Sequence, residues 1–330
     1  MPAEPAKTYL AKTLDHNSPL IACRFDPTGK FLFVGAEDFR VWRWDHAAGT
    51  KVEYNPESWV RSLAFNKPGD VLITGGFDGR LIWWPATVAE KPAAIRTVDA
   101  HKGMIRAIAV SPDGQFLASC GNDLKVKLWK VEDGSLVREM TGHERHIWNV
   151  AFHPNGKDLV TGDLVSKFIH WELESGKAAR TIPLPALTKY DPSFMADHGG
   201  PHSMAFNADG SRLACGGVTN VTNAFAGVGN PAIVVVDWAA GKEAIMHLTK
   251  GNIQAVAWGT VQHPEGFTIG ATGSGAGNLF FWKPDQKDEF HSFALPTGAR
   301  DMALHPDLVT IATVHHDSKI RLSVMAAKPA

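Results

Sequence analysis

The chain has 330 residues, of which 44% are hydrophobic and 20% charged, a composition typical of a folded protein with an extended core. Its 33 Lys and Arg residues balance 34 Asp and Glu residues, so no net charge attracts nucleic acid or an anionic membrane, and we expect neither as a partner. Cys23, Cys120 and Cys215 lie far apart in apolar runs, which argues against a disulfide framework. Residues 1–14 lack the apolar run of a signal peptide, so we expect a cytoplasmic protein.

Residues 8–14 alternate as a strand does and precede the first of seven similar units. Each unit contains short β-like runs and ends at one fixed position, which the first six units fill with tryptophan. The seven closing residues are Trp44, Trp84, Trp129, Trp171, Trp238, Trp282 and Ser323. A spacing in the forties, widened only before Trp238, is typical of a radially repeated β-sheet, because one such unit cannot bury both of its faces alone.

The third unit shows the pattern most clearly. An apolar run over residues 105–110 leads into Ser111-Pro112-Asp113-Gly114, and further runs follow at 116–120 and 126–129. Proline presets φ and glycine accepts positive φ, so the four residues between the first two runs predict a tight turn. The corresponding first runs of the seven units are 21–25, 60–65, 105–110, 147–152, 203–206, 253–258 and 299–304.

These units predict an all-β fold, a seven-bladed β-propeller of four-stranded antiparallel blades that forms one domain over residues 1–330. The last unit is one strand short before the chain ends. Residues 8–14 should pair with residues 319–324, complete that blade and close the ring, since an uncovered strand edge is unfavourable.

The units resemble the WD-repeat β-propeller family along nearly the whole chain. The specific marks are Gly142-His143, the pair Trp44-Asp45, and an aspartate six residues before the closing position at Asp38, Asp78, Asp123 and Asp317. Val165 and Ala276 depart from the aspartate pattern in units four and six.

The resemblance implies a buried hydrogen-bonded network of His101, Ser119, Asp123 and Trp129. A Ser, His and Asp in one unit also suggest a nucleophilic triad. The structural interpretation is favoured because the same set recurs in degraded form, as at His143, Thr161 and Trp171, and a catalytic site is not copied around a ring.

Two extra segments, 186–200 and 219–231, lengthen the fifth unit. In this family they fall in two kinds of loop that emerge on the same face. Tyr190, Phe194 and Phe225 lie in them, and long loops in a compact fold are usually functional, so we expect these aromatic residues to contact a partner. The alternative is a solvated insertion without a role.

The resemblance also implies that partners contact the residue near the start of each innermost strand and the residue two before it. The first set is Ile21, Arg61, Arg106, Trp148, His202, Gln254 and Arg300, and the second is Pro19, Trp59, Met104, His146, Gly200, Asn252 and Gly298. Arginine and tryptophan dominate interface hot spots, so these sets predict an acidic ligand. The candidate partner-binding residues are Trp59, Arg61, Arg106, His146, Trp148, His202, Gln254, Arg300, Tyr190, Phe194 and Phe225. The alternative is that the arginines are scattered surface charges.

We therefore expect a non-catalytic scaffold, monomeric on its own and without a cofactor, that binds an acidic peptide or loop of a protein partner. The alternative function is a propeller hydrolase or lyase acting on a small acidic molecule in the central pocket. His315 and His316, with His146 and His202, suggest a metal site. Adjacent side chains of a strand point to opposite faces, however, and the set of residues near the starts of the innermost strands contains no carboxylate. No metal is predicted.

Overall fold

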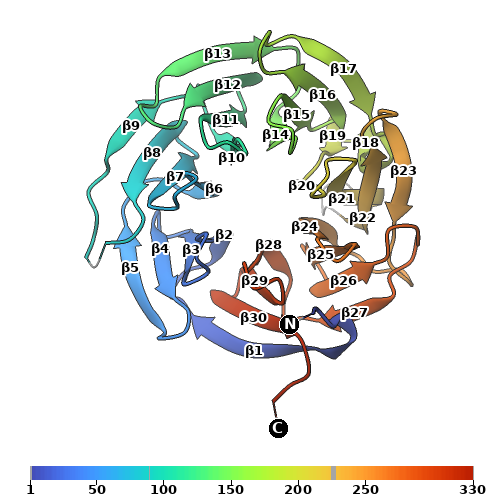
Figure 1. The fold of residues 1–330 in the computed structure, drawn as a ribbon. Helices are drawn as coiled ribbons and strands as arrows, with labels where there is room; N and C mark the ends of the chain where they lie inside the picture. Colours follow the sequence, from blue (N-terminus) through green and yellow to red (C-terminus); the bar gives the residue numbers. More distant parts are fainter. Residues whose placement is uncertain (1, 89, 224–227, 330) are drawn as a thin grey trace.

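Seven antiparallel sheets surround a central channel in the computed structural model, which describes residues 2–88, 90–223 and 228–329 (Figure 1). The first three blades are β2–β5 (Leu20–Phe25, Phe31–Ala36, Val41–Asp45, Thr50–Tyr54), β6–β9 (Val60–Phe65, Val71–Gly76, Arg80–Pro85, Arg96–Asp99) and β10–β13 (Ile105–Val110, Phe116–Gly121, Lys125–Lys130, Leu136–Thr141). Blade four is β14–β17 (Ile147–Phe152, Asp158–Asp163, Lys167–Glu172, Ala178–Pro183). The predicted propeller is confirmed.

The remaining blades complete the ring. Blade five is β20–β23 (Ser203–Phe206, Arg212–Asn223, Val228–Asp237, Lys242–His247), and blade six is β24–β27 (Val256–His263, Phe267–Gly273, Asn278–Trp282, His291–Ala294). Blade seven joins β28 (Ala299–Leu304), β29 (Thr310–His315) and β30 (Lys319–Met325) to β1 (Thr8–Asp15). A separate hairpin, β18 (Thr188–Asp191) and β19 (Ala196–Gly199), and two short 3-10 turns, Pro5–Lys7 and Pro185–Leu187, lie outside the blades.

The N-terminal strand closes the ring, as expected. β1 pairs antiparallel with β30 from Thr8 opposite Met325 to Asp15 opposite Lys319, and Figure 1 shows the two ends of the chain meeting at this blade. Leu14 is 7% exposed and packs in one cluster with Ile320 and Leu322. The strand therefore contributes both backbone pairing and apolar burial to blade seven.

The core lies between neighbouring blades, because the second strand of each blade is covered on both faces. β3 is buried over five of its six residues and reads as a nearly continuous apolar run. Phe33 of blade one packs with Leu72 and Trp84 of blade two, and equivalent clusters recur around the ring. Buried apolar surface stabilises the fold by about 25 cal/mol per Å², and this stabilisation is distributed around the whole ring rather than concentrated in one central core.

The predicted network in blade three is confirmed as a closed set of hydrogen bonds. His101 Nδ1 is 2.8 Å from Asp123 Oδ1 and its Nε2 is 2.7 Å from Ser119 Oγ, which also accepts from Trp129 Nε1 at 2.8 Å. Burial alone would raise the pKa of Asp123, but the hydrogen bond from His101 holds it below its ordinary value. Every hydroxyl and ring nitrogen in the set has a partner, which fits a structural role.

Blade four contains the same network with one shifted member. His143 Nδ1 is 2.8 Å from Asp163 Oδ2, its Nε2 is 2.7 Å from Thr161 Oγ1, and Trp171 Nε1 donates to that hydroxyl at 2.8 Å. Sequence spacing put Val165 at the aspartate position. Asp163, two residues earlier, supplies the carboxylate instead, so the blade is complete in chemistry although it departs in spacing.

Replacing Ser119 by alanine should cost roughly 2–5 kcal/mol of unfolding free energy. The substitution leaves the Trp129 indole N–H and His101 Nε2 without partners in a site where both rings are buried, and each unpaired buried group costs about 1–3 kcal/mol. Urea denaturation measures the loss. Ser292→Ala, on the exposed outer strand of blade six, is the matched control and should stay close to wild type. A Ser119→Ala loss below 1 kcal/mol would contradict the network's role.

Candidate functional site

One residue per blade is turned toward the channel by a recurrent irregularity of the innermost strands. In six of these strands the pairing register skips a residue, as between Val60 and Ser62 of β6 or Ala257 and Gly259 of β24. A bulge of this kind re-aims the skipped side chain without breaking the sheet. The skipped residues are Ile21, Arg61, Arg106, Trp148, Trp258 and Arg300. In blade five His202, just before β20, takes the equivalent place, and its backbone N–H donates to Gly216 O at 2.9 Å.

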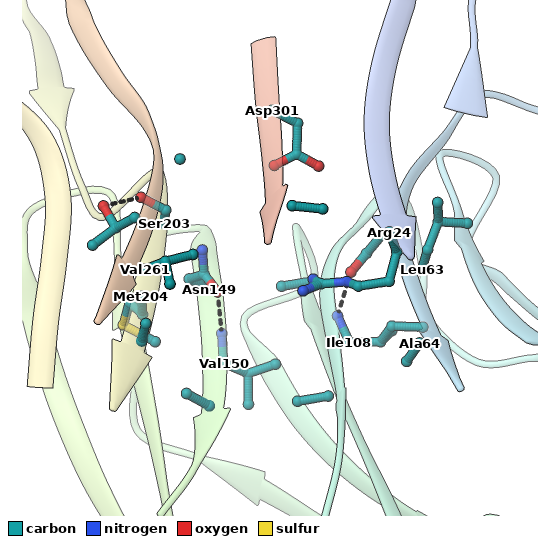
Figure 2. Close-up of a pocket in the computed structure, with 18 of the residues that line it drawn as sticks. Arg24, Leu63, Ala64, Ile108, Asn149, Val150, Ser203, Met204, Val261 and Asp301 are labelled. Carbon is teal, nitrogen blue, oxygen red and sulfur yellow. Dashed lines mark hydrogen bonds between the residues drawn. The ribbon is translucent and has the colours of Figure 1, made fainter. Parts of the chain in front are cut away.

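These seven residues line one cavity of about 760 Å³ along the channel axis. Figure 2 shows part of the cavity wall, which includes Arg24 of β2 and Asp301 of β28. Burial raises the pKa of the Asp301 carboxyl, and the positive charge of Arg24 opposes the rise. Asp301 accepts hydrogen bonds from the backbone N–H groups of Cys23 (2.9 Å) and Met302 (2.8 Å), so it joins blades seven and one.

Cations and aromatic rings from five consecutive blades converge at the channel mouth and form what we call the arginine pocket: Arg61, Arg106, Trp148, His202 and Trp258. The Arg61 guanidinium lies 5.9 Å from the Trp148 ring centre and 5.3 Å from that of Trp258. The Arg106 guanidinium lies 4.1 Å over Trp148. The His202 ring is 4.7 Å from Trp148 and 4.3 Å from Trp258. The indoles thus hold the cations together by cation–π contact.

Several polar groups of the arginine pocket have no partner among the residues that the structure describes. The Arg61 guanidinium makes no hydrogen bond or ion pair with any described residue, whereas Arg106 Nε donates to Asn122 Oδ1 at 2.7 Å. Trp148 Nε1 and His202 Nδ1 are buried and lack a hydrogen-bond partner among the residues described. Burial lowers the pKa of Arg61, and burial together with Arg61 lowers that of Arg106 to about 10. The charge of Asp301 favours the charged form of Arg61, but Arg61 and Arg106 repel each other, so the partly dry site attracts a further anion.

Arg300 lines the same cavity but its charge is already compensated. Its Nη1 donates to Glu37 Oε1 at 2.5 Å, and Glu37 belongs to a turn of blade one, 263 residues away in sequence. Among the described residues of the mouth, the arginines without an ion pair are therefore Arg61 of blade two and Arg106 of blade three.

The sequence alignment of the sixth blade was wrong, and Trp258 replaces Gln254 at the channel. The inner strand was expected over 253–258, whereas β24 begins at Val256. Gln254 lies before it and donates from Nε2 to Asn252 Oδ1 at 2.7 Å. The alternating apolar residues from Ile253 onward fit either register, so alternation alone could not choose between them.

A different signal would have found Trp258. In every blade the channel residue lies eight positions before a turn residue with positive φ, and these turn residues are Gly29, Gly69, Gly114, Gly156, Gly210, Gly266 and Leu308. Counting back from the turn glycine is more reliable than superposing apolar runs, because the strand between them must have a fixed length to span the blade.

Other predicted residues lie at or beside the mouth. His146 is exposed, and burial followed by the nearby charge of Arg106 lowers its pKa. Trp59 contacts both Phe39 and Phe77, with ring centres 5.8 and 5.5 Å away.

Among the described residues, no group of three or more His, Cys, Asp or Glu side chains is placed to hold a metal ion. His315 is buried and bonds within its blade, with Nε2 2.8 Å from Thr313 Oγ1.

The two insertions of the fifth blade lie together beside the mouth, as expected. The β18–β19 hairpin contacts the extended β21, and Lys189 Nζ donates to Val221 O. Gly200 directly follows the hairpin, and a Cβ added there would be 3.3 Å from the Trp148 indole. Tyr190 and Phe194 are 57% and 54% exposed on it, while Phe225 lies outside the described residues.

Acidification should destabilise the protein partly through His202. Burial first, and then the charges of Arg61 and Arg106, lower the pKa of His202 to about 3. The unfolded chain takes up this proton near pH 6.5, so between pH 6.5 and 3 it binds more protons than the folded chain and stability falls as pH falls. Urea unfolding at pH 7 and pH 5 should show a smaller pH-dependent loss for His202→Gln than for wild type. Equal losses in the two proteins would contradict this assignment. His315, whose pKa is also lowered, to about 4, is present in both proteins and so contributes equally to both losses.

Comparison with known proteins gives repeat-level similarity. The family model of the WD domain, G-beta repeat, matches residues 8–45, 51–85, 93–130 and 134–166. The nuclear distribution protein nudF of Aspergillus niger is 26% identical over 203 residues, 54% of this chain and 46% of that protein. Protein HIR1 of Mycosarcoma maydis is 28% identical over 145 residues (38% and 14%), and striatin-4 of Homo sapiens is 28% identical over 168 residues (45% and 21%). The matched part is less than half the length of each relative. No helix among the described residues is long and apolar enough to cross a bilayer.

Proposed function

We propose that this chain, a seven-bladed propeller whose first four units match the WD-repeat family model, is a non-catalytic protein-interaction scaffold that binds an acidic segment of a partner protein at the channel mouth. Members of the family mostly organise protein complexes. The observation that carries the acidic specificity is the Arg61 guanidinium, which has two indoles beside it and no polar partner among the described residues.

A carboxylate suits this position for two reasons. The planar guanidinium forks onto a carboxylate through two parallel hydrogen bonds. Burial, and after it repulsion from Arg61, lower the pKa of Arg106, and a bound carboxylate would offset that repulsion. Because the pocket is partly buried, such contacts are stronger than those of exposed ion pairs.

The exposed aromatic residues of the hairpin fit the same proposal. Tyr190 and Phe194 lie on the hairpin whose base borders Trp148, so a partner that covers the mouth would also contact them. Exposed aromatic side chains of this kind supply large contact area at interfaces.

Affinity capture with mass spectrometry tests the proposal. Wild type as bait should retain partners that Arg61→Gln/Arg106→Gln loses. Lys130→Gln/Lys157→Gln is the matched control, since it also removes two positive charges but from exposed positions outside the cavity. Identical partner sets for wild type and the arginine double variant would contradict binding at this mouth.

The volume of the cavity favours one alternative, a small acidic molecule bound in the channel, because sites for such ligands usually measure 300–1,000 Å³. Calorimetric titration with citrate distinguishes the two. Citrate binding that is lost in Arg61→Gln, without any protein captured by the mouth, would support the alternative.

A further inference from the structure

Phe39, Trp59 and Phe77 form an aromatic shelf on the blade-one and blade-two side of the mouth. Phe39 stacks on Trp59 with an interplanar angle of 21° and ring centres 5.8 Å apart, and Phe77 meets Trp59 edge-on at 74° and 5.5 Å. Trp59 Nε1 donates to Glu37 O at 2.9 Å. Although it stacks on Trp59, Phe39 remains 50% exposed to solvent.

The backbone at Phe39 is one that a bulky residue disfavours. Its φ is +64°, in the left-handed region. The equivalent turn positions of the other blades with positive φ are Gly79, Leu124, Ser166 and Ser318. A glycine or serine suffices for the turn, so the aromatic ring of Phe39 is not required by the turn itself, and its placement beside Trp59 calls for another explanation.

The aromatic shelf is continuous with the arginine pocket. Glu37, which accepts from Trp59, also binds Arg300 of the cavity wall at 2.5 Å. Trp59 directly precedes β6 and Arg61 is the bulged residue of that strand, so only Val60 separates them and their Cα atoms are at most about 7 Å apart. An extended peptide presents residues i and i+2 on one face at the same separation.

We infer that the partner segment is an extended peptide in which an acidic residue and a large apolar residue are separated by one residue. The carboxylate binds in the arginine pocket, and the apolar side chain covers Phe39 and Trp59 on the aromatic shelf. The inference rests on the proposed function, and it adds the second anchor and the spacing. Arg300 takes no part in the acid contact because Glu37 already compensates its charge.

Fluorescence anisotropy with labelled Gly/Ser-framed nonapeptides tests the spacing. One peptide contains Glu-Ser-Trp, a second Trp-Ser-Glu, a third Glu-Ser-Ser and a fourth Gln-Ser-Trp. We expect one of the first two to bind wild type at least tenfold more tightly than the third and fourth. A Glu-Ser-Ser peptide that binds as tightly as both Trp-containing acidic peptides would overturn the aromatic shelf and leave the proposed function standing.

Two glycine substitutions separate the shelf from the fold. Phe39→Gly suits the left-handed backbone, so the melting temperature should be retained while the tenfold advantage of tryptophan disappears and the dependence on glutamate remains. Leu124→Gly relieves the same conformation in blade three, where φ is +65°, and should leave all peptide affinities unchanged. Equal loss in both variants would overturn the shelf. If no glutamate peptide binds, or if Arg61→Gln binds them as well as wild type does, the proposed function fails together with this inference.

Discussion

Deleting residues 1–14 should lower the melting temperature by roughly 10 °C, since an unfolding entropy of about 2.1 cal/mol/K per residue over 330 residues makes a change of 1 kcal/mol shift it by about 1.4 °C. The deletion removes β1 apart from Asp15, and with it the pairing to β30 and the burial of Leu14 against Ile320 and Leu322. A buried leucine contributes about 1.5–3 kcal/mol and each backbone hydrogen bond about 0.5–1.5 kcal/mol.

The shortened protein should also associate, because β30 becomes an open edge that can pair with a second molecule. Circular dichroism melts and analytical ultracentrifugation measure the two effects. Truncation after Ala326 is the control, since Ala327, Lys328 and Pro329 are exposed. A melt within 2 °C of the intact protein, with no association, would show that β1 does not close the ring energetically.

The double substitution Arg61→Gln/Arg106→Gln should weaken binding of a captured partner by roughly 10²- to 10⁴-fold. Each charge-assisted hydrogen bond contributes about 1.5–3 kcal/mol when desolvated, and about 1.4 kcal/mol corresponds to a factor of ten in affinity. The melting temperature should stay the same or rise slightly, because the substitution removes both the buried charge and the repulsion from Arg61, the two causes that lower the pKa of Arg106.

Calorimetry at two salt concentrations sharpens this test. Contacts in the partly buried pocket should lose little affinity between 0.05 and 0.3 M salt, whereas steering by exposed charges would be screened. Lys130→Gln/Lys157→Gln serves again as the control for net charge. A Kd within threefold of wild type for the arginine variant would place the partner elsewhere on the propeller.

The repeat architecture was predictable because each blade solves the same physical problem with the same residues. Turns with Gly114 or Gly156 and closing indoles such as Trp129 fix strand lengths locally, so six of the seven innermost strands begin within one residue of their predicted starts. The sixth strand failed because no breaker separates Gln254 from Trp258, and both registers bury apolar residues.

The composition of the mouth was predictable but its electrostatics were not. Arg61, Arg106 and Trp148 could be assigned from strand position alone. The neutralisation of Arg300 depends on Glu37, which only ring closure brings near, and no spacing in the chain encodes that encounter. The aromatic shelf could not be predicted from the sequence for a similar reason, since Phe39 and Phe77 come from turns of different blades and both contact Trp59.

The skipped residue of each innermost strand has a consequence for how such a protein can change. Its side chain points away from the interblade core, and the residue is not paired with the neighbouring strand. Substituting it should therefore alter ligand preference with little effect on folding. New ligand specificities can therefore evolve by substitution of one bulged residue at a time, while the blades and their core stay the same.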